Sequence, residues 1–229
     1  MFNIEELEKN IGYCFSDKSM IKNAMCHSSY SNEHKDSASN ERLEFLGDAI
    51  LDMVVAERLF DAHKGVNEGV LSKMRAAIVR EESLAVLAKK IKLNEFILLG
   101  QSEKMAAGNE RASVLSDCFE AVVAAIFKDG GFNAVKKWLD NIITDEMYKK
   151  PTLLYCDYKT ALQEYLQSKK QYVKYVVVKE SGPDHEKVYE VEARVEGRCA
   201  GKGVNKTKKQ AEQDAAQDAL KKYEVEVCF

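Results

Sequence analysis

Acidic residues at helical spacing are the first feature of this sequence that could do chemistry. Glu41, Glu44 and Asp48 are spaced i, i+3 and i+7, so a helix would carry all three carboxylates on one face. Like charges at this spacing repel one another, by roughly 0.2–0.5 kcal/mol per pair. We therefore expect basic partners or a divalent cation beside this face.

A second acidic pair lies in an apolar segment. Asp117 and Glu120 are spaced i, i+3 within residues 113–127, which are otherwise strongly apolar, and an ionised carboxylate is costly to bury unless it is paired or bound to a metal. Carboxylates from two helices, with no histidine close in sequence, suit Mg²⁺ or Mn²⁺ better than zinc. The alternative is that each acidic face is only solvated, and spacing alone leaves both interpretations open.

Other catalytic chemistries find little support in the sequence. The four histidines, at positions 27, 34, 63 and 185, are far apart and suggest no general-base pair. The six cysteines include no pair at CxxC spacing, which argues against a structural zinc site. Reduced cysteine thiols are the expectation.

Composition limits the class of protein. The chain has 229 residues, of which 45% are apolar and 31% charged, as in globular proteins and unlike disordered ones. Its longest apolar run, residues 121–127, is far shorter than the roughly 20 residues of a membrane helix. The N-terminus lacks the pattern of a secretory signal. We expect a cytoplasmic protein with no membrane association.

Helical periodicity dominates residues 1–150. Leu43, Leu46 and Ile50 share one face of a predicted helix. Further helices are predicted over residues 71–80, 81–90 and 113–127. The glycine pair at 130–131 is expected to end the last of these helices. No convincing strand precedes about residue 170, so this half is predicted to be all-α.

The second half begins after a predicted linker at residues 151–156, which contains Pro151. Beyond the linker the hydrophobic period changes to that of strands, with many β-branched and aromatic residues. The expected elements are a helix over 157–168, strands over 172–178, 188–195 and 198–204, and a helix over 206–223. The sequence thus predicts an all-α domain over 1–150 followed by an α+β domain of order α-β-β-β-α over 157–226.

Three lysines crowd the start of the last predicted helix. Lys206, Lys208 and Lys209 lie at the end where cations are unfavourable, by about 0.3–1 kcal/mol each at low salt. A phosphate bound at the helix N-terminus would explain their placement. The alternative is an incidental basic turn.

Several of these segments resemble the signature sequences of the ribonuclease III family. Residues 40–49, Asn-Glu-Arg-Leu-Glu-Phe-Leu-Gly-Asp-Ala, are similar to the family signature, and residues 157–223 resemble the double-stranded RNA-binding domain of bacterial members. Further matches, in the family's order, are residues 27–30, 67–69, 71–76 and 115–121. The resemblance covers nearly the whole chain and implies an all-α endonuclease domain followed by an RNA-binding domain.

The resemblance also implies roles for individual acids. The residues that match the catalytic carboxylates holding Mg²⁺, with Mn²⁺ as a substitute, are Glu44, Asp48, Asp117 and Glu120. Loss of Asp48 or Glu120 is expected to stop the chemistry most completely. Glu41 and Glu68 match two family acids of lesser, supporting role. Phe45 resembles a dimer-contact residue, and core packing is its alternative role.

In the second half, the resemblance implies contacts that recognise the shape of duplex RNA. Gln163 and Glu164 match positions that contact ribose 2′-hydroxyls, and the three lysines above match phosphate-binding positions. His185 lies in a loop, residues 181–187, that resembles a minor-groove loop; the alternative is a solvated loop histidine. Such contacts read sugar and shape rather than base sequence.

Taken together, these features predict an Mg²⁺-dependent endoribonuclease that hydrolyses phosphodiester bonds in double-stranded RNA. The resemblance implies a homodimer without a small-molecule cofactor, and products with 5′-phosphate and 3′-hydroxyl ends and short 3′ overhangs. It also implies that precursors of ribosomal RNA, and some messenger and transfer RNAs, are the substrates.

Two other functions are compatible with parts of the sequence. A non-catalytic RNA-binding protein could use the same two folds, but relatives of that kind lose carboxylates, whereas this chain keeps all four. A structural helical domain with an RNA-binding tail would not need acids inside the apolar segment 113–127. The enzyme is therefore the leading hypothesis.

Overall fold

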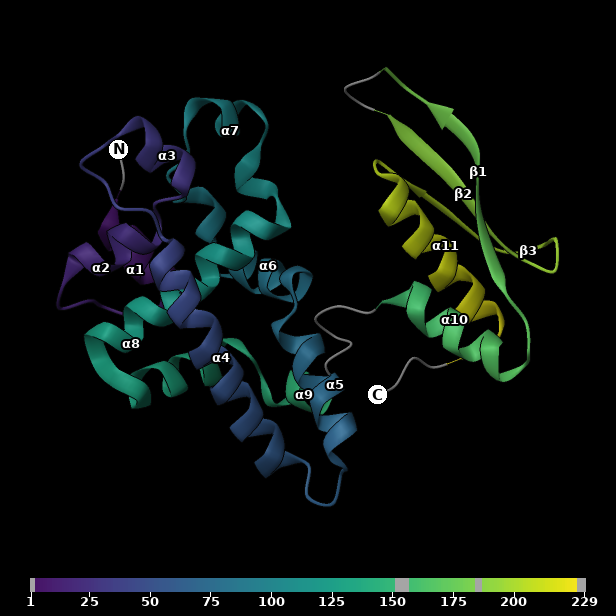
Figure 1. The fold of residues 1–229 in the computed structure, drawn as a ribbon, viewed down its shortest axis with the longest axis horizontal. Helices are drawn as coiled ribbons and strands as arrows, with labels where there is room; N and C mark the ends of the chain where they lie inside the picture. Colours follow the sequence, from purple (N-terminus) through teal and green to yellow (C-terminus); the bar gives the residue numbers. More distant parts are fainter. Residues whose placement is uncertain (1–2, 151–156, 184–186, 226–229) are drawn as a thin grey trace. The chain divides into compact units, whose positions relative to one another are not determined.

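The computed structural model describes residues 3–150, 157–183 and 187–225, which form two compact units (Figure 1). One unit is helical and lies in the N-terminal part of the chain, and the other combines helices with a sheet. The predicted linker, residues 151–156, lies outside the described residues. The bounds 1–150 and 157–226 therefore stay predictions.

The N-terminal unit is helical, as its periodicity predicts. Its α-helices are α1 (Ile4–Ile11), α2 (Lys18–Ala24), α3 (Ser28–Glu33), α4 (Glu41–Ala62), α5 (Glu68–Val79), α6 (Glu81–Lys90), α7 (Gln101–Met105), α8 (Ala112–Ile142) and α9 (Asp145–Lys149). Short 3-10 turns occupy Leu93–Glu95 and Gly108–Glu110. An isolated parallel bridge joins Cys26 to Leu98.

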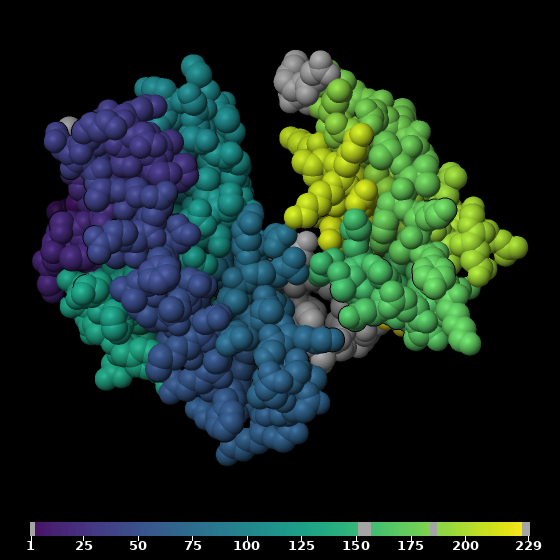
Figure 2. All heavy atoms as spheres, in the orientation of Figure 1, coloured from purple at the N-terminus to yellow at the C-terminus, as the bar shows by residue number. Residues whose placement is uncertain are grey.

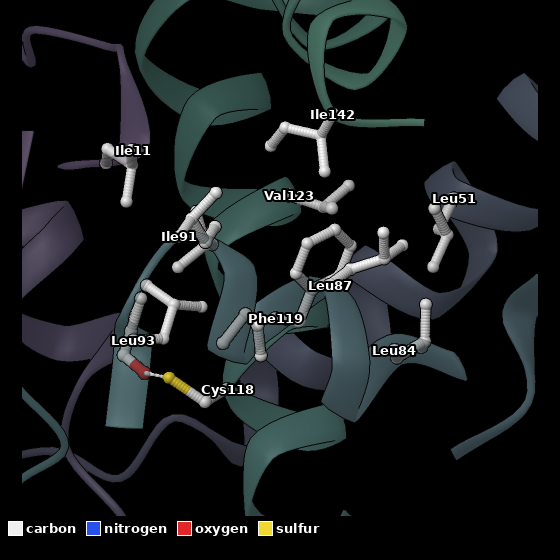
Figure 3. Packing of buried hydrophobic residues seen from close by; sticks show 14 of the residues in the cluster. Ile11, Leu51, Leu84, Leu87, Ile91, Leu93, Cys118, Phe119, Val123 and Ile142 are labelled. Carbon is white, nitrogen blue, oxygen red and sulfur yellow. Dashed lines mark hydrogen bonds between the residues drawn. The ribbon is translucent and has the colours of Figure 1, made fainter. Parts of the chain in front are cut away.

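The core of this unit forms where α4 and α6 pack against α8. Figure 3 shows Leu51 of α4 and Leu87 of α6 around Phe119 and Val123 of α8, all fully buried. Cys118 is also buried, with its Sγ 3.8 Å from the carbonyl oxygen of Ala24. Because Cys118 faces the core, the carboxylates on either side of it in α8 face elsewhere.

The prediction that the helix over residues 113–127 ends at the glycine pair is confirmed. Gly131 lies outside the helical region, with φ 77°, and separates two helical segments of α8, the second of which runs on to Ile142. The helix resumes because Val135, Trp138 and Leu139 are buried in the same core. Glycine alone interrupts a helix, and tertiary packing decides whether another turn follows.

The second unit has the predicted order α-β-β-β-α. Its elements are α10 (Tyr158–Ser168), β1 (Val173–Ser181), β2 (Val188–Val195), β3 (Arg198–Asn205) and α11 (Lys208–Lys222). The strands form an antiparallel sheet in the order β1-β2-β3. One face of this sheet is covered by α11, which packs against β2, β3 and α10.

Small residues let α11 lie close to the sheet. A Cβ added to Gly201 would lie 2.2 Å from the carbonyl oxygen of Ala215, and one added to Gly203 would lie 2.1 Å from that of Ala211. Either contact would be too short for a larger residue. The glycines of β3 and the alanines of α11 therefore set the separation of the two elements.

Candidate functional site

The two acidic segments meet where α4 crosses α8 (Figure 1). A Cβ added to Gly47 of α4 would lie only 1.8 Å from the carbonyl oxygen of Glu120 in α8. Glycine is therefore required here, because it lets the two backbones touch. Glu44 and Asp48, which flank Gly47 along α4, are thereby brought close to Glu120.

Asn40, which is 3% exposed, anchors the start of α4. Its backbone N–H donates to the carbonyl oxygen of Cys26 at 2.8 Å, and its side-chain amide donates to that of Ala24 at 3.4 Å. These bonds tie the helix to the end of α2. Asn40 thus holds the acidic face in place without belonging to it.

Glu120 has the most perturbed carboxyl group of the cluster. Its pKa is raised to about 8. Burial makes the largest contribution, and the negative charges of Asp48, Asp117, Glu44 and Asp52 add to it. A positive charge beside Glu120 would relieve both effects. A cation at this position would therefore be favoured.

The neighbouring acids show the same coupling. Burial raises the pKa of Glu44, and the charges of Asp117, Glu41 and Asp48 add to the rise. Burial also raises the pKa of Asp117, opposed by the nearby His27. The structure thus brings together five of the predicted acids: Glu41, Glu44, Asp48, Asp117 and Glu120.

The chemistry of this donor set fits a hard divalent cation. All five groups are oxygen ligands, and Glu44, Asp117 and Glu120 are half-buried rather than sealed from solvent. Across the described residues, no three acidic, histidine or cysteine side chains lie close enough together to form a complete ligand set by themselves. Mg²⁺ tolerates such a site, because it usually keeps several waters and binds through one or two carboxylates together with substrate phosphates.

Three residues at the cluster were not predicted from the sequence. Asp52 acts on Glu120, and its position four residues after Asp48 could have revealed it. The charge of Glu81 raises the pKa of Asp117 and that of His27 lowers it. Both residues come from distant segments, and no local spacing connects them to Asp117. His27 also caps α3, since its Nδ1 accepts a hydrogen bond from the Ser29 N–H at 3.2 Å, and burial lowers its pKa.

Two further predicted residues lie apart from the acids. Glu68 lies in the first turn of α5, where it accepts a hydrogen bond from the Ser72 hydroxyl at 2.7 Å. Its charge is not among those that act on Glu44, Asp117 or Glu120. Phe45 is 81% exposed, so it does not serve the core of its own chain.

The predicted RNA-binding residues lie on the surface of the second unit. Gln163 and Glu164 are exposed on α10, whereas His185 lies outside the described residues. The exposed Lys206 precedes α11, and Thr207 caps the helix by accepting a hydrogen bond from the Gln210 N–H at 3.2 Å. Exposed lysines therefore surround this helix N-terminus.

Lys208 and Lys209 open α11 itself, and both are exposed. The ammonium group of Lys208 lies 2.9 Å from a carboxylate oxygen of Glu180 and 5.2 Å from the ring centre of Tyr189. A phosphate that binds Lys208 must therefore compete with Glu180.

Along the parts of the chain that the structure describes, no helix has both the length and the apolar character needed to cross a membrane.

Comparisons with known proteins agree for both units. Residues 17–147 match the family described as Ribonuclease-III-like, and residues 158–223 match the family described as double-stranded RNA binding motif. The chain is 44% identical to Ribonuclease 3 of Pseudothermotoga lettingae over 84% of this chain and 83% of the relative. It is 43% identical to Ribonuclease 3 of Caldanaerobacter subterraneus subsp. tengcongensis, over 82% and 84% respectively.

Solved structures give the same result for the helical unit. A nuclease-domain structure of ribonuclease III from Campylobacter jejuni, described for flexibility in a region involved in dimer formation, is similar with 45% identity and a TM-score of 0.58. It covers 62% of this chain and 96% of its own length. A second nuclease-domain structure from the same organism has 43% identity and a TM-score of 0.57, and covers 62% of this chain and 95% of its own length.

Proposed function

The chain belongs to the ribonuclease III family and is an endoribonuclease specific for double-stranded RNA, and on this basis we propose that the carboxylate cluster at the α4–α8 crossing is its catalytic centre. One observation carries the proposal. The Gly47–Glu120 contact brings acids from two distant segments together, so that the charges of Asp48 and Glu44 on α4 add to the burial that raises the pKa of Glu120 on α8. The family is metal-dependent, and Mg²⁺, with Mn²⁺ as a substitute, is the ion that suits these oxygen ligands.

Four residues would hold the metal: Glu44, Asp48, Asp117 and Glu120. When bound, Mg²⁺ supplies a water of lowered pKa as nucleophile and neutralises charge on the scissile phosphate. The half-buried Glu120 and Asp117 would be held more firmly than the exposed Asp48, which faces solvent, from which RNA arrives. Glu41 would support the site from its edge, and Glu68, which lies apart from the cluster, would support its interface.

The products we propose are 5′-phosphate and 3′-hydroxyl ends with short 3′ overhangs. A 5′-phosphate end requires water as the nucleophile, because attack by the ribose 2′-hydroxyl would leave the phosphate on the 3′ end of the other product. Precursors of ribosomal RNA and some messenger and transfer RNAs of the cytoplasm are the substrates that family membership suggests.

A homodimer would supply the two centres that cutting both strands requires, because each chain carries one cluster. Three large apolar side chains on α4, Phe45, Met53 and Phe60, are 81%, 60% and 71% exposed. Their spacing of eight and seven residues, about two helical turns each, puts them along one face. Figure 2 shows α4, in blue, at the surface of the helical unit. An exposed apolar stripe of this kind suits a second copy of the chain.

The second unit would hold the duplex. We assign phosphate contacts to Lys206, Lys208 and Lys209 at the N-terminus of α11, which favours anions. Gln163 and Glu164 would contact 2′-hydroxyls, and His185 would enter the minor groove. These contacts recognise A-form shape with little preference for base sequence.

Cleavage of a long labelled RNA duplex, with and without Mg²⁺, tests the catalytic centre. The parent should cut only with the metal, whereas Glu120→Gln should bind the duplex and cut at least about a thousandfold more slowly, because it loses a charged ligand of the metal that stabilises the transition state. Glu57→Gln is the matched control, since Glu57 is an exposed acid of α4, the other helix of the crossing, and pairs with Lys136 of α8. This control should cut like the parent.

Two results would contradict the proposal. Cutting by Glu120→Gln at the parent's rate would place the chemistry elsewhere. Tight duplex binding by the parent without cutting, in either Mg²⁺ or Mn²⁺, would favour a non-catalytic RNA-binding protein.

A further inference from the structure

An arginine on α5 lies beside the carboxylate cluster and has no assigned role. Nη1 of Arg75 is 3.8 Å from Oδ2 of Asp52, and α5 packs against α4 at this point. Asp52 in turn acts on Glu120 through its charge. Arg75 is thus separated from the cluster by a single acidic residue.

The guanidinium of Arg75 has donors to spare. At 3.8 Å its contact with Asp52 is longer than a hydrogen bond, which rarely exceeds about 3.2 Å. An arginine carries five N–H donors in a planar fork. The side chains of Arg75 and Asp52 are 40% and 39% exposed, so these donors reach solvent beside the acids.

Two other arginines of the same unit are engaged more tightly. Arg111 forms a direct hydrogen bond to the carboxylate of Glu103. Arg58 contacts the carboxylates of Asp140 and Asp145 and lies 5.7 Å from the ring centre of Tyr148. The looser contact of Arg75 leaves it available to a ligand.

The electrostatics of the site create a need for such a cation. A duplex brings several phosphates near the cluster at once, and five or more carboxylates repel them. Metal ions at the cluster would neutralise the scissile phosphate, but the phosphates on either side of it would still meet a negative surface. Arginine suits this task, because its fork matches phosphate oxygens with two parallel hydrogen bonds.

We propose that Arg75, positioned by Asp52, binds the RNA backbone at a phosphate neighbouring the one that is cut. Arg75 is then a substrate-positioning residue of the nuclease unit, separate from the lysines of the second unit. This inference rests on the proposed catalytic centre, since the scissile phosphate is placed by that centre.

The test measures duplex affinity as a function of monovalent salt, at fixed Mg²⁺, in the full-length Glu120→Gln protein. Adding Arg75→Gln should weaken binding about tenfold at low salt. The slope of log affinity against log salt should fall in magnitude by about one for each Arg75 that contacts the duplex. Arg75→Lys should keep the slope of the parent and lose only part of the affinity, because it keeps the charge but not the fork.

Lys136→Gln is the matched control. It also removes one positive charge from an ion pair at the surface of the helical unit, the pair with Glu57, and should leave both affinity and slope unchanged. Thermal unfolding separates binding from folding, since an ion pair this exposed contributes only about 0–1 kcal/mol to stability. Arg75→Gln should therefore unfold within a few degrees of its parent.

Unchanged affinity and slope in folded Arg75→Gln would overturn the inference, and so would equal losses in Lys136→Gln. Because the readout is binding by a protein that does not cut, it is independent of the cleavage test. Failure of the catalytic centre would appear as cutting by Glu120→Gln, and failure of the Arg75 contact would appear as an unchanged salt slope.

Discussion

Gly47 shows how one residue can carry the geometry of a site without taking part in its chemistry. It lies between Glu44 and Asp48 on α4, and the missing side chain lets the backbone of Glu120 approach. Any larger residue would force the helices apart. The acids would then lose the proximity through which burial and like charge raise the pKa of Glu120.

Gly47→Ala is expected to destabilise the protein by about 2 kcal/mol or more and to reduce cleavage strongly. Alanine would gain about 1 kcal/mol of helix propensity, but its Cβ would lie 1.8 Å from the Glu120 carbonyl oxygen, and overpacking costs about 1–3 kcal/mol or more. Urea unfolding and duplex cleavage are the measurements.

Gly69→Ala is the control for this change. Gly69 lies in the first turn of α5, and the nearest atom to its added Cβ is 3.5 Å away, an ordinary contact. Gly69→Ala should be neutral or stabilising. Equal stability of Gly47→Ala and the parent would show that the helices can separate without cost.

At the scale of elements, α4 serves three purposes with three faces. Leu51, Val54 and Val55 are buried in the core, the acids line the crossing with α8, and the apolar stripe of Phe45, Met53 and Phe60 faces solvent. The position of α4 depends on α8, the helix against which it packs. The segment between α1 and α2 is tied to α8 through Asp129.

Asp129 ties that segment to α8 with three hydrogen bonds. Its carboxylate accepts from the Tyr13 hydroxyl at 2.9 Å, the Ser16 N–H at 3.1 Å and the Asp17 N–H at 2.9 Å. Burial tends to raise the pKa of Asp129, but these hydrogen bonds outweigh it and lower the pKa. The same contact, together with burial, raises the pKa of Tyr13 to about 12.

The stability of the helical unit should therefore depend on pH through Asp129. A lowered folded-state pKa means that this contribution is present above the pKa of the unfolded chain, about 3.9, and is lost as pH falls through the folded value. Asp129→Asn should be less stable than the parent at pH 7, by roughly 1–3 kcal/mol. The difference should shrink below about pH 4. Urea unfolding between pH 3 and 7 measures it, and a difference that does not change with pH would rule out the ionised carboxylate as its cause.

At the scale of the whole molecule, the division of labour lies between two units joined in one chain. Among the described residues, the helical unit carries one carboxylate cluster at the α4–α8 crossing, and the second unit matches the double-stranded RNA binding motif. A single cluster can cut one strand at a time. Cutting both strands in one encounter therefore requires a second chain, for which the exposed stripe on α4 is the surface that we propose.

Phe45→Asp is expected to convert a dimer to a monomer. Burying a carboxylate in an apolar interface is costly, and two-fold symmetry would double that cost. Sedimentation velocity measures the mass, and double-strand cutting should give way to single-strand nicks. Met105→Asp is the control, because Met105 is 89% exposed but lies on α7, away from the stripe. A parent that sediments as a monomer, or an unchanged dimer in Phe45→Asp, would contradict the proposed homodimer.

The sequence by itself determined the class of each unit and the principal acids. Helical and strand periods follow from local alternation of apolar residues, so the all-α unit and the α-β-β-β-α order could be predicted. The spacing of Glu44 with Asp48, and of Asp117 with Glu120, puts each pair on one helix face without reference to the rest of the chain. Family resemblance then joined the two pairs into one site.

Only the tertiary structure decided what lies next to those acids. Glu81, His27 and Arg75 come from three other helices or their caps, and no local pattern connects them to α4 or α8. The continuation of α8 past Gly131 likewise depends on core contacts of Trp138. The physical reason is the same in each case: sequence spacing fixes directions within an element, whereas neighbours from different elements depend on long-range packing.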